Sequence, residues 1–190
     1  MSKRIVAALL CLGAVAGPAR AQGIVYEVEP HHTFVTFEVV HNGTSTTRGR
    51  FDTVTGSVML DPAAGTGRAD IQIETASVNS GSKPFDEHLR NKDFFDVTAF
   101  PRASFQGSAF TFEAGKVVRV AGTLTLLGVA HDVVLEARRF NCYQNPRSKR
   151  DTCGGDFETT IARSKWGMGF GLPGIPDSVR LVVQIEAVRP

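Results

Sequence analysis

Apolar and polar side chains alternate along residues 32–41, where Val35, Phe37 and Val39 all fall on one face. Successive side chains of a strand point to opposite faces of its sheet, so a period of two predicts a β-strand with one buried face. The same pattern recurs along most of the chain. It predicts strands at 25–29, 33–41, 50–61, 69–78, 102–106, 109–113, 117–126, 132–140, 157–163 and 179–188.

Short turn signals separate these runs, among them Asn42-Gly43 and Gly154-Gly155. Many short strands joined by tight turns are typical of an antiparallel barrel or a β-sandwich. We therefore expect an all-β protein. A closed barrel has the further advantage that it leaves no exposed sheet edge.

Residues 83–95 depart from the alternation and predict one short helix. Ser82 precedes this segment and is a favourable N-cap residue. Phe85 and Leu89 are four residues apart, so they form an apolar stripe along one side of the helix. A lone helix with such a stripe must dock on another element, and we expect it to cover the mouth of the barrel.

The first residues, 1–21, are expected to form a secretory signal peptide. Lys3 and Arg4 precede an apolar run, and Ala19-Arg20-Ala21 is a small-x-small cleavage site. Residues 22–190 would then form a single exported domain. Loss of the leader removes three cationic side chains and takes the formal charge from +2 to −1. The remaining chain lacks the positive field that nucleic-acid binding usually requires, so we expect no nucleic-acid partner.

Cys142 and Cys153 are the cysteines that remain outside the leader. In an oxidising compartment we expect them to form a disulfide around the polar loop 143–150. A redox or metal-binding role is disfavoured, because the spacing is not that of a Cys-x-x-Cys motif.

The candidates for catalytic or metal chemistry are weak. His31 and His32 are adjacent, so a strand would point them to opposite faces, and we predict no metal site. Asp86 has the i,i+4 spacing of an ion pair with Arg90, and it lies two residues before His88. Residues two apart on a helix do not face each other, so a surface ion-pair network is the favoured interpretation. An enzyme that acts on a lipid head group through Asp86 and His88 is kept as the alternative.

The aromatic content is unusual, since 13 phenylalanines accompany one tryptophan and two tyrosines. The plain interpretation is that these rings fill the core. However, Phe85, Phe94, Phe95 and Phe100 gather around the predicted helix. Rings at that position favour an apolar cavity that accepts a long hydrocarbon.

An ordered set of motifs runs along nearly the whole of 22–190. The motifs are His32, Val35, Phe37, Val39 and His41; Gly49-Arg50-Phe51 and Gly56; Asp86-Glu87-His88-Leu89-Arg90; Asp93-Phe94-Phe95-Asp96-Val97; Phe100-Pro101; Gly122-Thr123-Leu124-Thr125-Leu126 with Gly128-Val129; and Ile161-x-Arg163-Ser164-x-Trp166-Gly167-Met168. In this order, they resemble the YceI-like family. One departure is Leu127, where that family often has histidine, and the loop between the two cysteines is a second.

The resemblance implies an exported, periplasmic, lipocalin-like up-and-down barrel with the short helix near its mouth. It implies a cavity for a polyisoprenoid, an isoprenoid quinone or a fatty-acid-like molecule. We expect no required cofactor and no catalytic activity. A filled barrel with a purely structural role is the other alternative. The sequence leaves open a homodimer and a transient contact with a membrane or a membrane protein. The expected lipid-binding residues are Val35, Phe37, Val39, Phe51, Phe85, His88, Leu89, Phe94, Phe95, Phe100, Phe105, Ile161, Arg163, Trp166 and Met168, and Arg90 is a further candidate for the head group.

Overall fold

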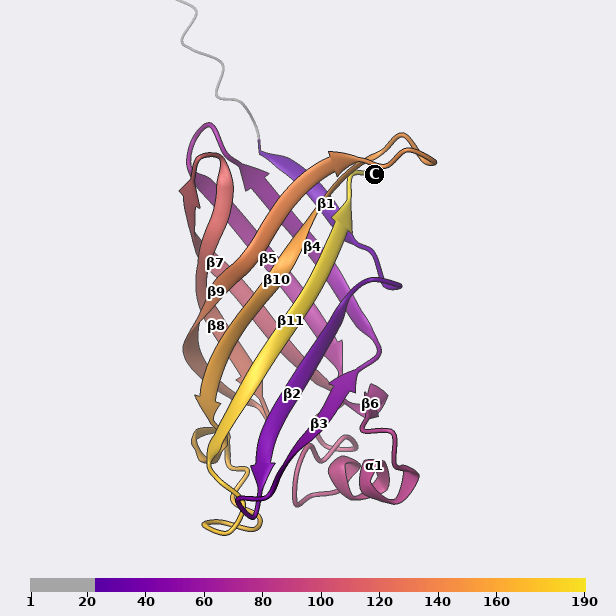
Figure 1. Ribbon diagram of the computed structural model, residues 1–190, viewed down its shortest axis with the longest axis vertical. Helices are drawn as coiled ribbons and strands as arrows, with labels where there is room; N and C mark the ends of the chain where they lie inside the picture. The colour runs from indigo at the N-terminus through magenta and orange to yellow at the C-terminus, as the bar shows by residue number, and fades with distance from the viewer. Residues whose placement is uncertain (1–22) are drawn as a thin grey trace, which may run out of the picture.

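A computed structural model describes residues 23–190 of the chain. The predicted signal peptide, 1–21, lies outside the described residues, and both it and the periplasmic location stay predictions. The structure is all-β with one α-helix, as expected (Figure 1). The elements are β1 (Ile24–Val28), β2 (Phe34–His41), β3 (Ser45–Phe51), β4 (Val54–Asp61), β5 (Thr66–Glu74), η1 (Thr75–Ser77), β6 (Val78–Asn79), α1 (Lys83–Arg90), β7 (Arg102–Glu113), β8 (Lys116–Leu126), β9 (Val129–Gln144), β10 (Asp151–Ala162), η2 (Arg163–Trp166) and β11 (Ser178–Val188).

The sheet closes on itself as an antiparallel up-and-down barrel, in the order β1-β4-β5-β7-β8-β9-β10-β11 and back to β1. The closing contact pairs Glu27 with Val188 and Val28 with Ala187. Strands β2, β3 and β6 extend the wall from β11 at the end of the barrel where α1 lies (Figure 1). We call this the helix end. The barrel prediction is confirmed and the sandwich is excluded.

A break between β1 and β2 allows β11 to pair with both strands. Thr33 lies in the break and is fully buried. Its hydroxyl donates to the carbonyl of Glu186 at 3.1 Å and accepts from the N–H of the same residue at 3.1 Å. The threonine side chain therefore stands in for a missing backbone partner and satisfies two buried polar groups where the wall divides.

Some predicted strand boundaries are wrong. The run predicted at 50–61 is two strands, because the chain turns after Phe51, and residues 45–51 form a strand that sequence periodicity missed. The runs predicted at 102–106 and 109–113 are one strand, since a register shift between Gly107 and Ala109 inverts the alternation without ending the ladder.

The disulfide prediction agrees with the structure, in which Cys142 and Cys153 are bonded. These residues lie directly opposite each other on β9 and β10, which extend to Gln144 and from Asp151. The predicted loop 143–150 is therefore too long, because part of it belongs to the hairpin.

The predicted helix is also too long, since α1 ends at Arg90 and the segment 91–101 folds back as a series of turns. Ser82 is the N-cap residue, but its side chain makes no capping hydrogen bond. Leu89 is buried and Phe85 packs against the core, so the predicted apolar stripe faces the barrel.

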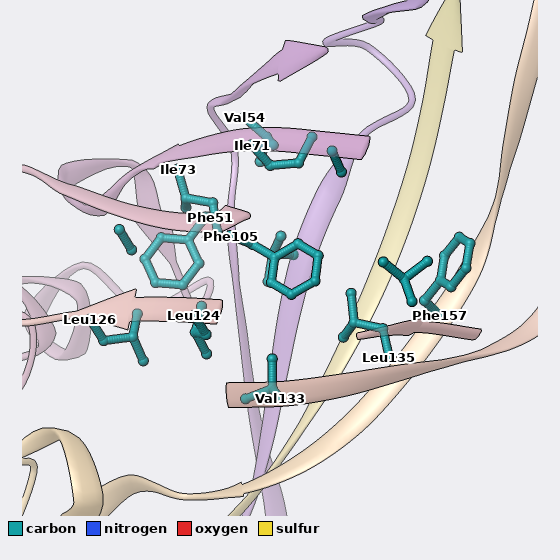
Figure 2. Close-up of a cluster of buried hydrophobic side chains, with 14 of the residues drawn as sticks. Phe51, Val54, Ile71, Ile73, Phe105, Leu124, Leu126, Val133, Leu135 and Phe157 are labelled. Carbon is teal, nitrogen blue, oxygen red and sulfur yellow. The ribbon is translucent and has the colours of Figure 1, made fainter. Parts of the chain in front are cut away.

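Large aliphatic and aromatic side chains from all sides of the wall fill the barrel interior. Figure 2 shows them converging between the strands. Inward-facing residues alternate with outward ones, as the period of two requires. The labelled members are Phe51, Val54, Ile71, Ile73, Phe105, Leu124, Leu126, Val133, Leu135 and Phe157.

Candidate functional site

A cavity of about 300 Å³ lies in the barrel interior at the helix end. Strands β2, β3 and β11 form part of its wall, and α1 with the segment 91–101 covers it. We call it the helix-end cavity. Its lining residues are Val35, Phe37, Val39, His41, Thr47, Phe51, Ile73, Phe85, His88, Leu89, Phe94, Phe95, Ala103, Leu124, Leu126, Ile161, Arg163, Met168, Phe170, Ile175, Val179 and Leu181.

A smaller cavity of about 100 Å³, the inner cavity, lies deeper in the barrel. Val35, Ile73, Leu124 and Leu181 line both cavities. The two spaces are therefore neighbours that share part of their apolar lining. The inner cavity is small because bulky rings, including Phe105, Phe110, Phe140 and Phe157, occupy most of the space.

Most of the predicted lipid-binding residues meet at these cavities. The structure thus brings together residues from four strands, α1 and the turns that follow it, and η2 with the loop after it, although their contact with a lipid stays a prediction. Phe105 lines the inner cavity, and Val35 lines both. Those at the helix-end cavity are Val35, Phe37, Val39, Phe51, Phe85, His88, Leu89, Phe94, Phe95, Ile161, Arg163 and Met168.

Two predicted residues lie apart from both cavity walls in the described part of the chain. The Phe100 ring packs beside Gly128 in the β8–β9 turn, and its carbonyl accepts a hydrogen bond from the Thr75 hydroxyl at 2.7 Å. Trp166 is only 2% exposed, and its Nε1–H donates to the carbonyl of Leu124 at 3.2 Å. A buried indole N–H needs such a partner, which holds the ring in the wall rather than in the cavity.

The cavity lining also contains residues that sequence reasoning did not single out. Val179 and Leu181 belong to the alternating face of β11, so the pattern marks them as inward-facing but does not distinguish ligand wall from core. Phe170 and Ile175 lie between η2 and β11 in a segment without periodicity. No local signal predicts that they reach the cavity, because the loop is placed by its tertiary contacts.

Aromatic contacts close the helix end of the barrel. The Phe95 ring lies 5.0 Å from the ring of Phe51 and 6.2 Å from that of Phe37, as measured between ring centroids. Nearby, the His88 ring lies 5.0 Å from Phe94 and 5.0 Å from Phe170, edge to face in both cases. Such pairs add to the stabilisation from buried area, so the cover is bound to the wall by several rings.

The catalytic alternative based on Asp86 and His88 finds little support in the geometry. The Asp86 carboxylate is buried and accepts hydrogen bonds from the backbone N–H and the hydroxyl of Ser80, both at 2.6 Å. His88 instead faces Asp93 at 3.2 Å. The predicted Asp86–Arg90 ion pair is wrong, because the Arg90 guanidinium donates to the carbonyls of Ala76 and Val78.

Asp86 makes stability at the helix end dependent on pH. The Ser80 hydrogen bonds hold the pKa of the Asp86 carboxyl below its ordinary value. A carboxyl whose pKa is lowered by folding stabilises the protein above its unfolded pKa, near 4, and loses this contribution as pH falls through the folded pKa. Asp86→Asn should therefore lower the free energy of unfolding by about 1–3 kcal/mol at neutral pH. The difference from wild type should shrink in acid.

Urea titrations at several pH values test this prediction. Glu87→Gln is the matched control, because Glu87 is the next residue on α1 and is exposed. We expect the control to follow the wild-type curve. A constant difference between Asp86→Asn and wild type across the acid range would contradict an ionic role for Asp86.

Arg163 is 4% exposed and is the charged residue most fully enclosed at the cavity. Its guanidinium donates to three backbone carbonyls, those of Met168 at 2.8 Å, Ile175 at 3.0 Å and Pro176 at 3.1 Å. Burial lowers the pKa of Arg163, and the charge of Asp177 opposes that shift. The Arg163 side chain thus holds together the segment between η2 and β11. It also forms part of the cavity lining.

The polar side chains in the lining of the helix-end cavity are His41, Thr47, His88 and Arg163. Among the lining residues that the structure describes, none is acidic. The site is therefore suited to hydrogen-bond acceptors near the cover and to apolar groups deeper inside. Arg90, the further head-group candidate, is directed toward backbone carbonyls instead of the cavity.

Within residues 23–190, no group of three or more potential ligand side chains comes together to hold a metal ion. In the same part of the chain, no helix has the length and apolar character needed to cross a membrane.

The fold and the site define a small antiparallel β-barrel with an apolar interior that a helix covers at one end. The chain belongs to the YceI-like family, whose domain matches residues 26–187. It is 30% identical to a UPF0312 protein of Azotobacter vinelandii over the full length of both chains. It is 34% identical to a UPF0312 protein of Pseudomonas savastanoi pv. phaseolicola, over 72% of this chain and 73% of that one.

Solved structures share this architecture. BcnA of Burkholderia cenocepacia superposes with a TM-score of 0.70 at 28% identity, over 84% of this chain and 99% of its own. The YCEI protein of Campylobacter jejuni gives 0.69 at 25% identity, over 80% and 90%. A polyisoprenoid binding domain from Saccharophagus degradans gives 0.63 at 18% identity, over 88% and 99%, a likeness of fold alone.

Proposed function

We propose that this protein binds and carries a long-chain amphipathic lipid of the polyisoprenoid, isoprenoid quinone or fatty-acid-like class. The tail would occupy the helix-end cavity and extend toward the inner cavity, while the head group would lie beside His88 and Arg163. The observation that carries the proposal is the pair of adjoining apolar cavities, the larger of which is covered by α1 and the segment 91–101. Burial of each methylene contributes about 0.8 kcal/mol, so a long tail supplies affinity without a charged anchor.

Two further points support the proposal. The solved domain from Saccharophagus degradans, whose fold is similar, is described as polyisoprenoid binding. The leader expected at residues 1–21 is consistent with lipid transport in the periplasm, where a lipid that leaves a membrane must be shielded from water. We propose binding without turnover, because Asp86 and His88 turn to different partners instead of converging on one point.

Native mass spectrometry of gently purified protein is the direct test. We expect a population heavier than the polypeptide and, after organic extraction, a lipid whose mass accounts for the difference. Added polyprenyl lipid should also raise the Tm, since a ligand that binds only the folded state stabilises it. A bare polypeptide mass together with an unchanged Tm across isoprenoids, quinones and fatty acids would refute the carrier function.

A variant that fills the cavity tests its location. Ala103 is 2% exposed and lines the helix-end cavity from β7, so Ala103→Phe should occupy space that the tail needs. We expect lower lipid occupancy and a preference for shorter chains, at a stability cost of about 1–3 kcal/mol from overpacking. Ala109→Phe is the control, because Ala109 lies on the same strand but is exposed. Equal occupancy in the two variants would show that the lipid binds elsewhere.

A further inference from the structure

The loop that joins η2 to β11 has a composition unusual for a protein surface. The loop comprises residues 167–177, and its first ten residues read Gly-Met-Gly-Phe-Gly-Leu-Pro-Gly-Ile-Pro without a charged side chain. Asp177, at its end, accepts hydrogen bonds from the N–H and the hydroxyl of Ser164. Within the uncharged segment, Phe170 is 45% exposed and Leu172 is 38% exposed. Large apolar side chains on an uncharged surface segment indicate a contact with an apolar phase or partner.

Arg163 fixes the base of this loop while leaving its tip exposed. The guanidinium binds the carbonyls of Met168 and Ile175, so the two sides of the loop are joined through one side chain, as in a compact Ω-loop. At the tip, the N–H of Leu172 donates to the carbonyl of Gly169 at 3.3 Å, and Gly171 adopts a φ of +76°. Phe170 and Leu172, the two exposed apolar residues, belong to this turn.

The loop is continuous with the helix-end cavity. Phe170 and Ile175 are part of the cavity lining, and the Phe170 ring contacts His88 on α1. On its other side, Gly174 lies near the Asn42 side chain in the β2–β3 turn. The loop, drawn in yellow at the bottom of Figure 1, therefore lies at the same end of the barrel as α1 and borders the cavity.

We propose that the segment 167–176 docks on the interfacial layer of a lipid bilayer, with Leu172 and the exposed part of the Phe170 ring inserted, and that the cavity exchanges its lipid through this contact. The exchange step rests on the carrier function proposed above, whereas the docking does not. A bilayer fits this surface better than a protein partner, because protein interfaces combine apolar contacts with directional hydrogen bonds. The side chains of 167–176 offer no hydrogen-bond donor, while Phe and Leu suit an apolar medium of any shape.

Flotation with vesicles of mixed phosphatidylcholine and phosphatidylglycerol tests the docking. Leu172→Glu places a charge at the tip, and Leu172 lies outside the lining of both cavities. Ile24→Glu is the matched control, because Ile24 is also 38% exposed but lies on β1 at the opposite end of the barrel. We expect Leu172→Glu to reduce the vesicle-bound fraction about tenfold or more, and Ile24→Glu to bind as wild type does.

The salt dependence of vesicle binding and the source dependence of lipid uptake complete the test. Wild-type binding should persist in high salt, since insertion of apolar side chains is not screened, and its loss there would overturn the proposal. Uptake of a polyprenyl lipid from dilute dispersion should be equal in wild type and Leu172→Glu, whereas uptake from vesicles should fall in the variant. Wild type that takes up dispersed lipid but does not float with vesicles would overturn the docking and leave the carrier function intact. Wild type that floats with vesicles but takes up no lipid would refute the carrier function and leave the docking intact.

Discussion

Replacing Arg163 with methionine is expected to lower the Tm by about 6–12 °C. The substitution keeps most of the side-chain volume but removes the donors to the carbonyls of Met168, Ile175 and Pro176. Each buried acceptor left without a partner costs about 1–3 kcal/mol, so a total near 3 kcal/mol is a conservative expectation. In a domain of this size, 1 kcal/mol corresponds to about 2–4 °C. Calorimetry or thermal circular dichroism measures the shift.

Arg180→Met is the control for this prediction. Arg180 forms ion pairs with Glu38 and Glu158 on the outer face of the barrel, and its side chain is 45% exposed. Exposed ion pairs contribute about 0–1 kcal/mol, so the Tm should move by only a few degrees. Equal shifts in the two variants would mean that Arg163 acts as an ordinary surface cation and does not organise the loop.

The second large effect is expected for Phe51→Ala, which should lower the free energy of unfolding by about 3–5 kcal/mol. The Phe51 ring is 5% exposed, packs tilted against Phe37 and edge to face against Phe95, and lines the helix-end cavity. Its loss removes buried apolar area and also leaves a void that the rigid barrel wall can fill only in part. Chemical denaturation measures the change.

Phe34→Ala removes the same side chain from the neighbouring strand but from the outer face. Phe34 is partly buried beneath the guanidinium of Arg50, whose Cζ lies 4.2 Å from the ring centroid. We expect a loss of about 1 kcal/mol, the order of an exposed cation–π contact. The enlarged cavity of Phe51→Ala should also recover stability when a long-chain lipid is added, whereas Phe34→Ala should gain no more than wild type does. A loss below 1 kcal/mol for Phe51→Ala would show that the ring packs loosely.

The strand faces could be predicted because alternation is a local property. Val35, Phe37 and Val39 are inward in the structure as the period of two requires, and the face of β11 is predicted equally well. The errors occur where the pattern changes phase. A bulge near Gly107 and a turn after Phe51 each depend on the neighbouring strand, and one residue of register is enough to invert a face.

The candidate site was predicted in part. The apolar stripe of α1 identifies its covering face, since Phe85 and Leu89 both reach the cavity. Trp166 illustrates the limit, because the sequence marks it as a large apolar side chain, yet its indole N–H finds a carbonyl of β8 and stays in the wall. Phe170 and Ile175 were missed because they lie in a loop without periodicity, so no local sequence pattern predicts its position in the fold.

The sequence by itself determined the all-β class, the inward faces of the strands, the existence of one amphipathic helix and the pairing of the two cysteines. The first three depend on residue types that lie close together in the sequence. The cysteine pairing depends on there being only two cysteines outside the expected leader. Only the tertiary structure decided that the barrel closes between β1 and β11, that cavities remain inside it, and that Arg163 holds an apolar loop beside the larger of those described. These features arise from contacts between distant segments, whose packing depends on the volume left by every other side chain.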